Sequence, residues 1–239
     1  MITKKRTVKK FGLIGGVGPE STIAYYRLII KRFQEITKSN SYPDFIIKNV
    51  DMTEMIDYVV NQDYNKLIDF LEKNTNYIQK AGVDFGAIAS NTPHIVYDKL
   101  MDRIDLQMIS IVEETCKKAQ KMNLKTVGLF GTKSTMTNDF YQKTGTKFGL
   151  DIVIPSNNEI DYIHDKYMNE LIYKDIREDT KLHLIKIAKN LRDKHSIEGL
   201  IIGGTELSLI LSQKDFKDMY LLDTAMIHVD AIVEEMIKE

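Results

Sequence analysis

Short apolar segments that end in glycine or small polar residues alternate with helical segments along the chain. Seven such segments read as strands: 8–16, 45–51, 86–89, 125–131, 152–155, 199–203 and 219–222. Seven others have helical periodicity: 23–37, 65–81, 112–122, 134–148, 161–173, 180–194 and 223–237. Strands that alternate with helices predict an α/β fold with a parallel, doubly wound sheet.

The segment 84–94, DFGAIASNTPH, carries the first candidate site. Its apolar part is typical of a buried parallel strand, which puts Ser90, Asn91 and Thr92 at the carboxyl end of that strand. Ligands bind at such ends in open α/β sheets. Pro93 suits the first turn of a following helix, capped by Asn91 or Thr92, and the free N–H groups of that turn would seat a carboxylate.

An internal echo predicts two lobes. GLIGG at 12–16 returns as GLFGT at 128–132, and each copy is followed by a Ser-Thr pair. The strand that ends at Ser90 has a counterpart that ends at Gly204, at similar spacing from these motifs. We therefore expect two pseudo-symmetric lobes, 1–112 and 113–222, with residues 223–238 packing back on the first and a cleft between the two strand tips. Chance likeness between βαβ units is the alternative.

Composition narrows the classes of partner. The 33 basic and 34 acidic residues give a net charge of −1, which argues against a nucleic-acid partner. The basic residues Lys4, Lys5, Arg6, Lys9 and Lys10 predict a solvated lead-in, with a nucleic-acid arm as the alternative, and no signal-peptide stretch follows them. No window approaches a membrane span, so no membrane association is expected. A single cysteine, Cys116, excludes an internal disulfide framework and favours a cytoplasmic protein.

Five motifs together give a family resemblance. They are GGVGPEST, ASNTPH, GLFGTKST, GGTEL and DTAMIH, in order along nearly the whole chain. The chain resembles the aspartate/glutamate racemase superfamily of amino-acid racemases that work without pyridoxal phosphate. The resemblance implies two α/β lobes with the active site between them, a small amino acid or dicarboxylate as ligand and a homodimer. It implies no cofactor and no metal.

The chain departs from this family at both catalytic positions. Family members carry one cysteine before Asn-Thr and another before Thr-Glu, and the two thiols exchange the Cα proton on opposite faces. These positions are Ser90 and Gly204 here. A serine hydroxyl is a weak base and glycine offers no group, so the two-thiol mechanism does not transfer. Cysteines placed at both positions are expected to restore some racemisation.

The resemblance also assigns roles to nearby residues. From their own chemistry, His94 and Glu206 are the candidate acid/base groups: either would assist Ser90 on one face, and Glu206 or water would act on the other. Hydrogen bonding across the cleft is the alternative role of His94, and helix-dipole stabilisation is that of Glu206. Positions that match the family's substrate-binding residues, or that flank them, are Gly16, Val17, Asp51, Met52, Asn91, Thr92, Thr132, Lys133, Thr135 and Thr205. Helix capping is the alternative role for the threonines and for Asn91.

The sequence does not decide which amino acid is the substrate. The family's aspartate-selective members hold the side-chain carboxylate with an arginine after the second strand, where this chain has Asp51 and Glu54. The substrate is then not aspartate, or Lys133 or Lys174 supplies the cation. The stretch is more similar to the broad-specificity branch of these racemases. Two functions remain: a racemase with non-thiol acid/base groups, or a non-racemising carboxylate-binding protein or one-base lyase or decarboxylase.

Overall fold

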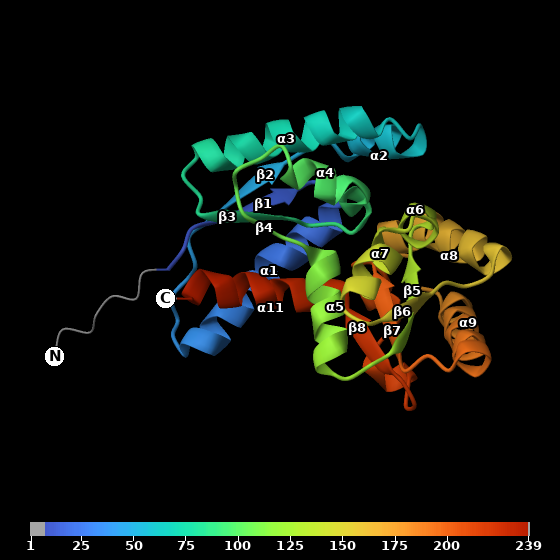
Figure 1. Ribbon diagram of the computed structural model, residues 1–239. Coiled ribbons are helices and arrows are strands. Elements are labelled where there is room, and N and C mark those ends of the chain that lie inside the picture. The colour runs from blue at the N-terminus through green and yellow to red at the C-terminus, as the bar shows by residue number, and fades with distance from the viewer. Residues whose placement is uncertain (1–7, 239) are drawn as a thin grey trace. The chain divides into compact units, whose positions relative to one another are not determined.

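Two four-stranded parallel sheets form the framework of the protein (Figure 1). The computed structural model describes residues 8–238, so the basic residues Lys4, Lys5 and Arg6 lie outside the described part. Each sheet orders its strands second, first, third, fourth, as β2-β1-β3-β4 and β6-β5-β7-β8. This repeated order confirms the two-lobed α/β fold that the internal echo predicts.

The first sheet consists of β1 (Phe11–Gly15), β2 (Phe45–Asn49), β3 (Phe85–Ile88) and β4 (Met108–Ile109). Phe11 is in register with Phe45 and Phe85 on its two neighbours, and the Phe11 and Phe85 rings lie 5.2 Å apart. The flanking helices are α1 (Pro19–Thr37), α2 (Met52–Val60), α3 (Tyr64–Lys80) and α4 (Tyr97–Met101). Helices α3 and α1 lie on opposite faces of this sheet (Figure 1).

The second sheet consists of β5 (Thr126–Gly131), β6 (Asp151–Val153), β7 (Gly199–Gly203) and β8 (Tyr220–Asp223). Its longer helices are α5 (Ile111–Lys121), α7 (Phe140–Lys147), α8 (Asn157–Asn169) and α9 (Glu178–His195), and its short ones are α6 (Lys133–Thr137) and α10 (Leu207–Ile210). Three single turns of 3₁₀ helix, at Thr92–Val96, Leu171–Tyr173 and Gln213–Asp215, and the last helix, α11 (Thr224–Ile237), complete the described elements. All residues of β7, and all of β5 except the partly exposed Thr126, are buried, which makes these two strands the apolar centre of this sheet.

The chain divides into two compact units. Unit 1 holds the described residues up to Ala89, Val96–Ser110 and the residues from His228 on, whereas unit 2 holds Ser90–Ile95 and Ile111–Ile227. The end of β3 and the candidate residues that follow it therefore fall in different units. Most of α11, with His228, belongs to unit 1.

Unit 1 contains a buried polar contact around His228. The imidazole Nε2 donates to the Ile109 carbonyl oxygen at 2.9 Å, because a carbonyl can only accept. The other ring nitrogen, Nδ1, is then the acceptor for the Tyr25 hydroxyl at 2.7 Å. Burial lowers the pKa of His228 to about 4, so the ring is neutral at pH 7.

Several elements differ from the sequence-based expectations. Helix α2 was not expected, and it begins after Asp51, whose carboxylate accepts from the Thr53 amide at 2.8 Å as an N-cap. The helix expected at 134–148 is two helices, because Asn138 has an extended backbone and ends α6. The helix expected after Pro93 begins as a 3₁₀ turn.

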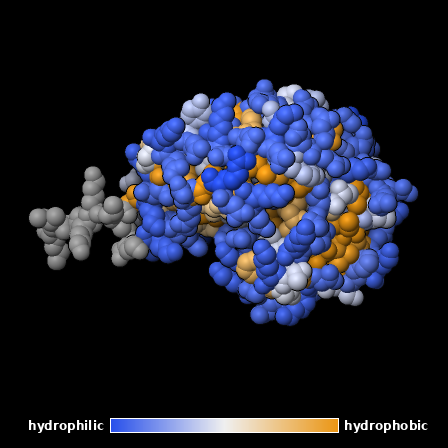
Figure 2. All heavy atoms as spheres, turned by 45° about the horizontal axis from the view of Figure 1, so that its top comes forward, coloured by the Kyte–Doolittle hydropathy of each residue, from blue (hydrophilic) through white to orange (hydrophobic). Residues whose placement is uncertain are grey.

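The face in Figure 2 is largely hydrophilic, with hydrophobic atoms showing through in separate places. Within residues 8–238, no helix combines the length and the apolar character that crossing a membrane requires.

Candidate functional site

The Ser90–Ile95 segment is fixed to unit 2 by a buried chain of hydrogen bonds. The Tyr141 hydroxyl donates to Asn91 Oδ1 at 2.6 Å, and Asn91 Nδ2 donates to Thr224 Oγ1 at 3.1 Å. The Thr224 hydroxyl donates in turn to the Ile202 carbonyl of β7 at 2.9 Å. Asn91 therefore ties the segment to α7 through Tyr141 and to β7 through Thr224, and neither partner was singled out from the sequence.

Three threonine hydroxyls meet beside this segment. The Thr92 oxygen lies 3.3 Å from that of Thr132 and 3.1 Å from that of Thr135, and the last two lie 3.0 Å apart. Thr132 also caps α6 by accepting from the Thr135 amide at 3.2 Å. Thr135 is fully buried, whereas Thr92 and Thr132 are partly exposed. Each hydroxyl both donates and accepts, so the threonine cluster of Thr92, Thr132 and Thr135 can turn donors toward a carboxylate.

The environment of Gly204 differs from what a cysteine position requires. A Cβ added to Gly204 would lie 2.5 Å from Cε2 and 2.7 Å from Oη of Tyr167, a residue of α8. Carbon atoms do not approach this closely without displacement of one of the two groups. The expectation that cysteines at 90 and 204 restore some racemisation stays a prediction, and the structure adds a condition to it: the Tyr167 ring must shift to admit the second side chain.

Glu206 accepts two hydrogen bonds at the same place. The Tyr167 hydroxyl donates to Glu206 Oε2, and the Thr205 hydroxyl donates to the same oxygen at 2.9 Å. Glu206 is 5% exposed and Tyr167 is 8% exposed. Burial, followed by the Glu206 charge, raises the pKa of Tyr167 well above its usual value, so the phenol stays protonated.

Ser90 and His94 lie on either side of the hydrogen-bonded Asn91. Ser90 is partly exposed, and His94 is buried. The His94 amide donates to the Asn91 carbonyl at 3.0 Å within the 3₁₀ turn. Free amides at the start of this turn were expected to bind a carboxylate. The His94 amide is not free for this role, because it already donates to Asn91.

The candidates of unit 1 gather at the carboxyl ends of β1 and β2. Gly16 has a φ of +79°, and a Cβ there would lie 2.7 Å from Asn49 Oδ1 and against the Val50 backbone, so only glycine fits. Val17 is buried, Met52 is partly buried in the first turn of α2, and Asp51 caps that helix. The backbones of the β1 and β2 ends thus pack closely around Gly16.

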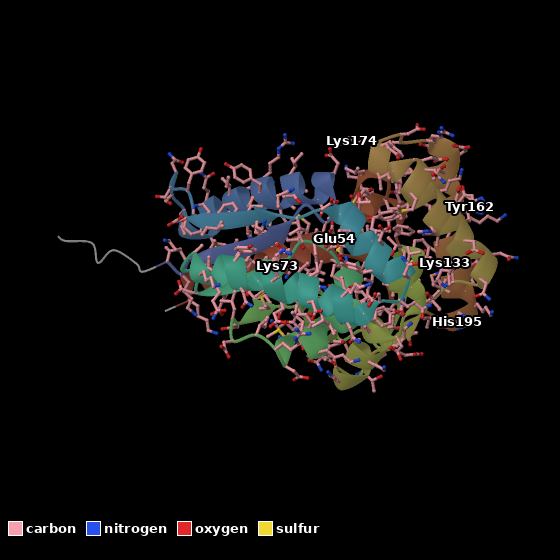
Figure 3. All side chains as sticks on the ribbon, turned by 90° about the horizontal axis from the view of Figure 1, so that it is seen from above. Glu54, Lys73, Lys133, Tyr162, Lys174 and His195 are labelled. Carbon is pink, nitrogen blue, oxygen red and sulfur yellow. The ribbon has the colours of Figure 1, made fainter. Side chains whose placement is uncertain are left out.

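A polar hollow adjoins this end of β2. It has a volume of about 520 Å³, and its lining includes Asp51, Glu54 and Lys73. Figure 3 shows Glu54 on α2 and Lys73 on α3. The lining carries both carboxylates and lysines. It contains no arginine, the residue that the family resemblance assigns to binding an aspartate side chain.

The two lysines considered as replacement cations lie in unit 2 (Figure 3). Lys133 Nζ forms an ion pair with Asp161 at 2.6 Å, and more than half of each side chain is exposed. Lys174 follows the 3₁₀ turn at Leu171–Tyr173 with a left-handed backbone. Lys133 therefore already has a carboxylate partner.

The thiol of Cys116 is poorly suited to proton transfer at neutral pH. It lies fully buried in α5, and burial, with a smaller contribution from Glu113, raises the pKa of its thiol to about 12. A thiol with such a pKa stays protonated at neutral pH and is a poor nucleophile.

Comparison with known proteins supports a single family. The family model described as Asp/Glu/Hydantoin racemase matches residues 14–232. The chain is 30% identical over 147 residues to "Broad specificity amino-acid racemase RacX" of Bacillus subtilis (strain 168), and the match spans 59% of this chain and 63% of that protein. The chain thus spans less than two thirds of that relative's length.

Two solved structures match over almost the whole chain. A putative Asp/Glu racemase from Yersinia pestis has a TM-score of 0.89 at 26% identity and covers 96% of this chain and 100% of its own. An aspartate racemase homologue from Pyrococcus horikoshii OT3 has a TM-score of 0.84 at 32% identity, covering 97% and 100%. Motifs, sheet topology and matched residues agree, and the chain belongs to the Asp/Glu/Hydantoin racemase family.

Proposed function

We propose that this protein is an amino-acid isomerase that binds the α-carboxylate of a small amino acid at the threonine cluster and exchanges the Cα proton without a pair of thiols. The observation that carries the proposal is the meeting of three hydroxyls within 3.3 Å, from two strand-end segments of a racemase-family chain. Thr205 follows β7, but its hydroxyl donates to Glu206 at 2.9 Å and is not part of the cluster. No cofactor is required by this chemistry, since the reaction moves only a proton.

The substrate class we infer is an amino acid without an acidic side chain. Asp51 and Glu54 stand where aspartate-selective members place an arginine, and Lys133 is paired with Asp161. The hollow beside Asp51 is lined by carboxylates and lysines together, with no arginine among its lining residues. The printed name of the Bacillus subtilis relative, a broad-specificity racemase, agrees with this inference.

The test combines ligand binding with proton exchange. Neutral amino acids are expected to raise the melting temperature and to lose their Cα proton to deuterium in D₂O, as followed by NMR, whereas aspartate and glutamate are expected to exchange slowly or not at all. Binding stabilises the folded state by mass action, by about 2.7 kcal/mol at 100 times the dissociation constant. Rapid exchange of aspartate or glutamate would contradict the inferred substrate class.

A matched pair of variants locates the site. Thr135→Val removes a buried hydroxyl of the threonine cluster and is expected to abolish most of the ligand-induced shift. Thr137→Val removes an exposed hydroxyl that donates to the Lys133 carbonyl of α6 at 2.9 Å, and it should leave the shift unchanged. Equal shifts in the two variants would place the ligand elsewhere.

The second candidate function is a carboxylate-binding protein or one-base lyase or decarboxylase. The absence of a thiol at both family positions, Ser90 and Gly204, favours it. A thermal shift without Cα exchange would identify the binding protein, and loss of the amino acid would identify the lyase or decarboxylase.

The homodimer, the cytoplasmic location and a cleft between the lobes stay predictions.

A further inference from the structure

The missing second cysteine leaves a place that another reactive side chain fills. Gly204 lacks a side chain, and the hydroxyl end of Tyr167 comes within 2.7 Å of where its Cβ would be. Because the backbone of Gly204 is outside the left-handed region, the glycine is not needed for its φ angle. Its small size is what allows the phenol to reach the end of β7.

The phenol at this place is joined to a carboxylate. Tyr167 donates to Glu206, which also accepts from Thr205 at 2.9 Å. Among the described residues, no lysine, arginine or histidine forms an ion pair with Glu206, so hydroxyl donors alone satisfy the buried carboxylate in the described contacts. Such an arrangement can pass a proton from the phenol to the carboxylate and back.

We propose that Tyr167 is the catalytic acid/base at the β7 end and that Glu206 is its positioning residue and proton store. This inference rests on the proposed isomerase function and names the group that acts on one face of the substrate. Neither residue alone replaces the thiol: Tyr167 reaches the position, and Glu206 supplies the basicity.

The proton balance of the step is simple. In one direction the Cα–H bond breaks and the proton binds the Tyr167 oxygen, while the phenol's own proton moves to Glu206. The electron pair stays on the substrate as a carbanion stabilised by its carboxylate. The carbanion then takes a proton from water on the opposite face, and Glu206 releases its proton to solvent, so that no proton is gained or lost over the turnover. In the other direction water accepts the Cα proton, the phenol donates its proton to the carbanion, and Glu206, protonated from solvent, returns a proton to the phenol. The phenol is neutral in both resting states, which agrees with its raised pKa.

The experiment compares Tyr167→Phe and Glu206→Gln with the wild type and with Tyr162→Phe. Tyr162 lies on the same helix, stacked 4.0 Å from the His183 ring and partly exposed, so it is a matched control (Figure 3). Interconversion of L- and D-enantiomers of the neutral amino acid that exchanges best is measured by chiral chromatography, with Cα exchange by NMR and binding by thermal shift. Tyr167→Phe should lower interconversion by about 100-fold or more and keep the ligand-induced shift.

Glu206→Gln provides the second reading, because it keeps an acceptor for Tyr167 but cannot take up a proton. It should also lower kcat for interconversion while KM and the ligand-induced thermal shift stay unchanged, a split that a purely structural role would not produce. Interconversion within about threefold of wild type in folded Tyr167→Phe overturns the role of Tyr167 and leaves the isomerase proposal standing. Binding without any exchange in the wild type overturns both.

Discussion

Gly204→Cys is expected to lower the free energy of unfolding by about 1–3 kcal/mol, because its Cβ would overlap the Tyr167 ring. The ring is buried and hydrogen-bonded to Glu206, so it cannot simply turn away. Urea unfolding of the single variant measures this cost. The Ser90→Cys/Gly204→Cys double variant is expected to racemise by two thiols only where the Tyr167 ring shifts to admit the second side chain.

A double-mutant cycle with Tyr167→Ala isolates the cause. Tyr167→Ala alone is destabilising, since it leaves a cavity in the core of unit 2. In that background, however, Gly204→Cys should cost almost nothing, and the coupling between the two changes should be of the same order as the cost of Gly204→Cys alone. Equal costs in both backgrounds would show that the ring is not the obstacle.

Acidification from about pH 7 to about pH 5 is expected to lower the free energy of unfolding of the wild type by about 2 kcal/mol through His228. The folded pKa of His228 is about 4, below the ordinary value near 6.5, so the unfolded chain binds the extra proton first. Stability is therefore complete above about pH 6.5 and falls as the pH drops toward the folded pKa. Chemical unfolding at several pH values measures the slope.

His228→Gln is the control for this slope. Glutamine can still donate to the Ile109 carbonyl and accept from Tyr25, but it does not titrate. His164 also has a lowered pKa, from burial and Lys133, so only the difference between wild type and variant reports on His228. Parallel slopes would mean that the imidazole is not buried and neutral.

The sheet architecture could be predicted because the strongest signals are local. Strand β7 spans Gly199–Gly203, the bounds predicted from the apolar run that ends in glycine. Helix α2 was missed because its start depends on the Asp51 cap and its burial on Met55 and Val59 alone, which is a weak periodic signal over nine residues. Strand β4 has two residues, too few to show a pattern.

The candidate site was only half visible in the sequence. Thr92, Thr132 and Thr135 were grouped because they match the substrate-binding positions that the family resemblance implies, and the structure places their hydroxyls in contact. Tyr167 could not be anticipated, since it lies in a helix far along the chain and reaches Gly204 only through tertiary packing. Only the glycine at position 204 could have pointed to it, because the space that a cysteine side chain would take there is open to another residue.

The single cysteine, Cys116 in α5, can report local unfolding of unit 2. A thiol reagent cannot reach Cys116 while its side chain is enclosed, so the labelling rate at low reagent concentration measures how often the helix and its surroundings come apart. Ligands that bind unit 2 should slow that labelling, without any added fluorophore or engineered cysteine.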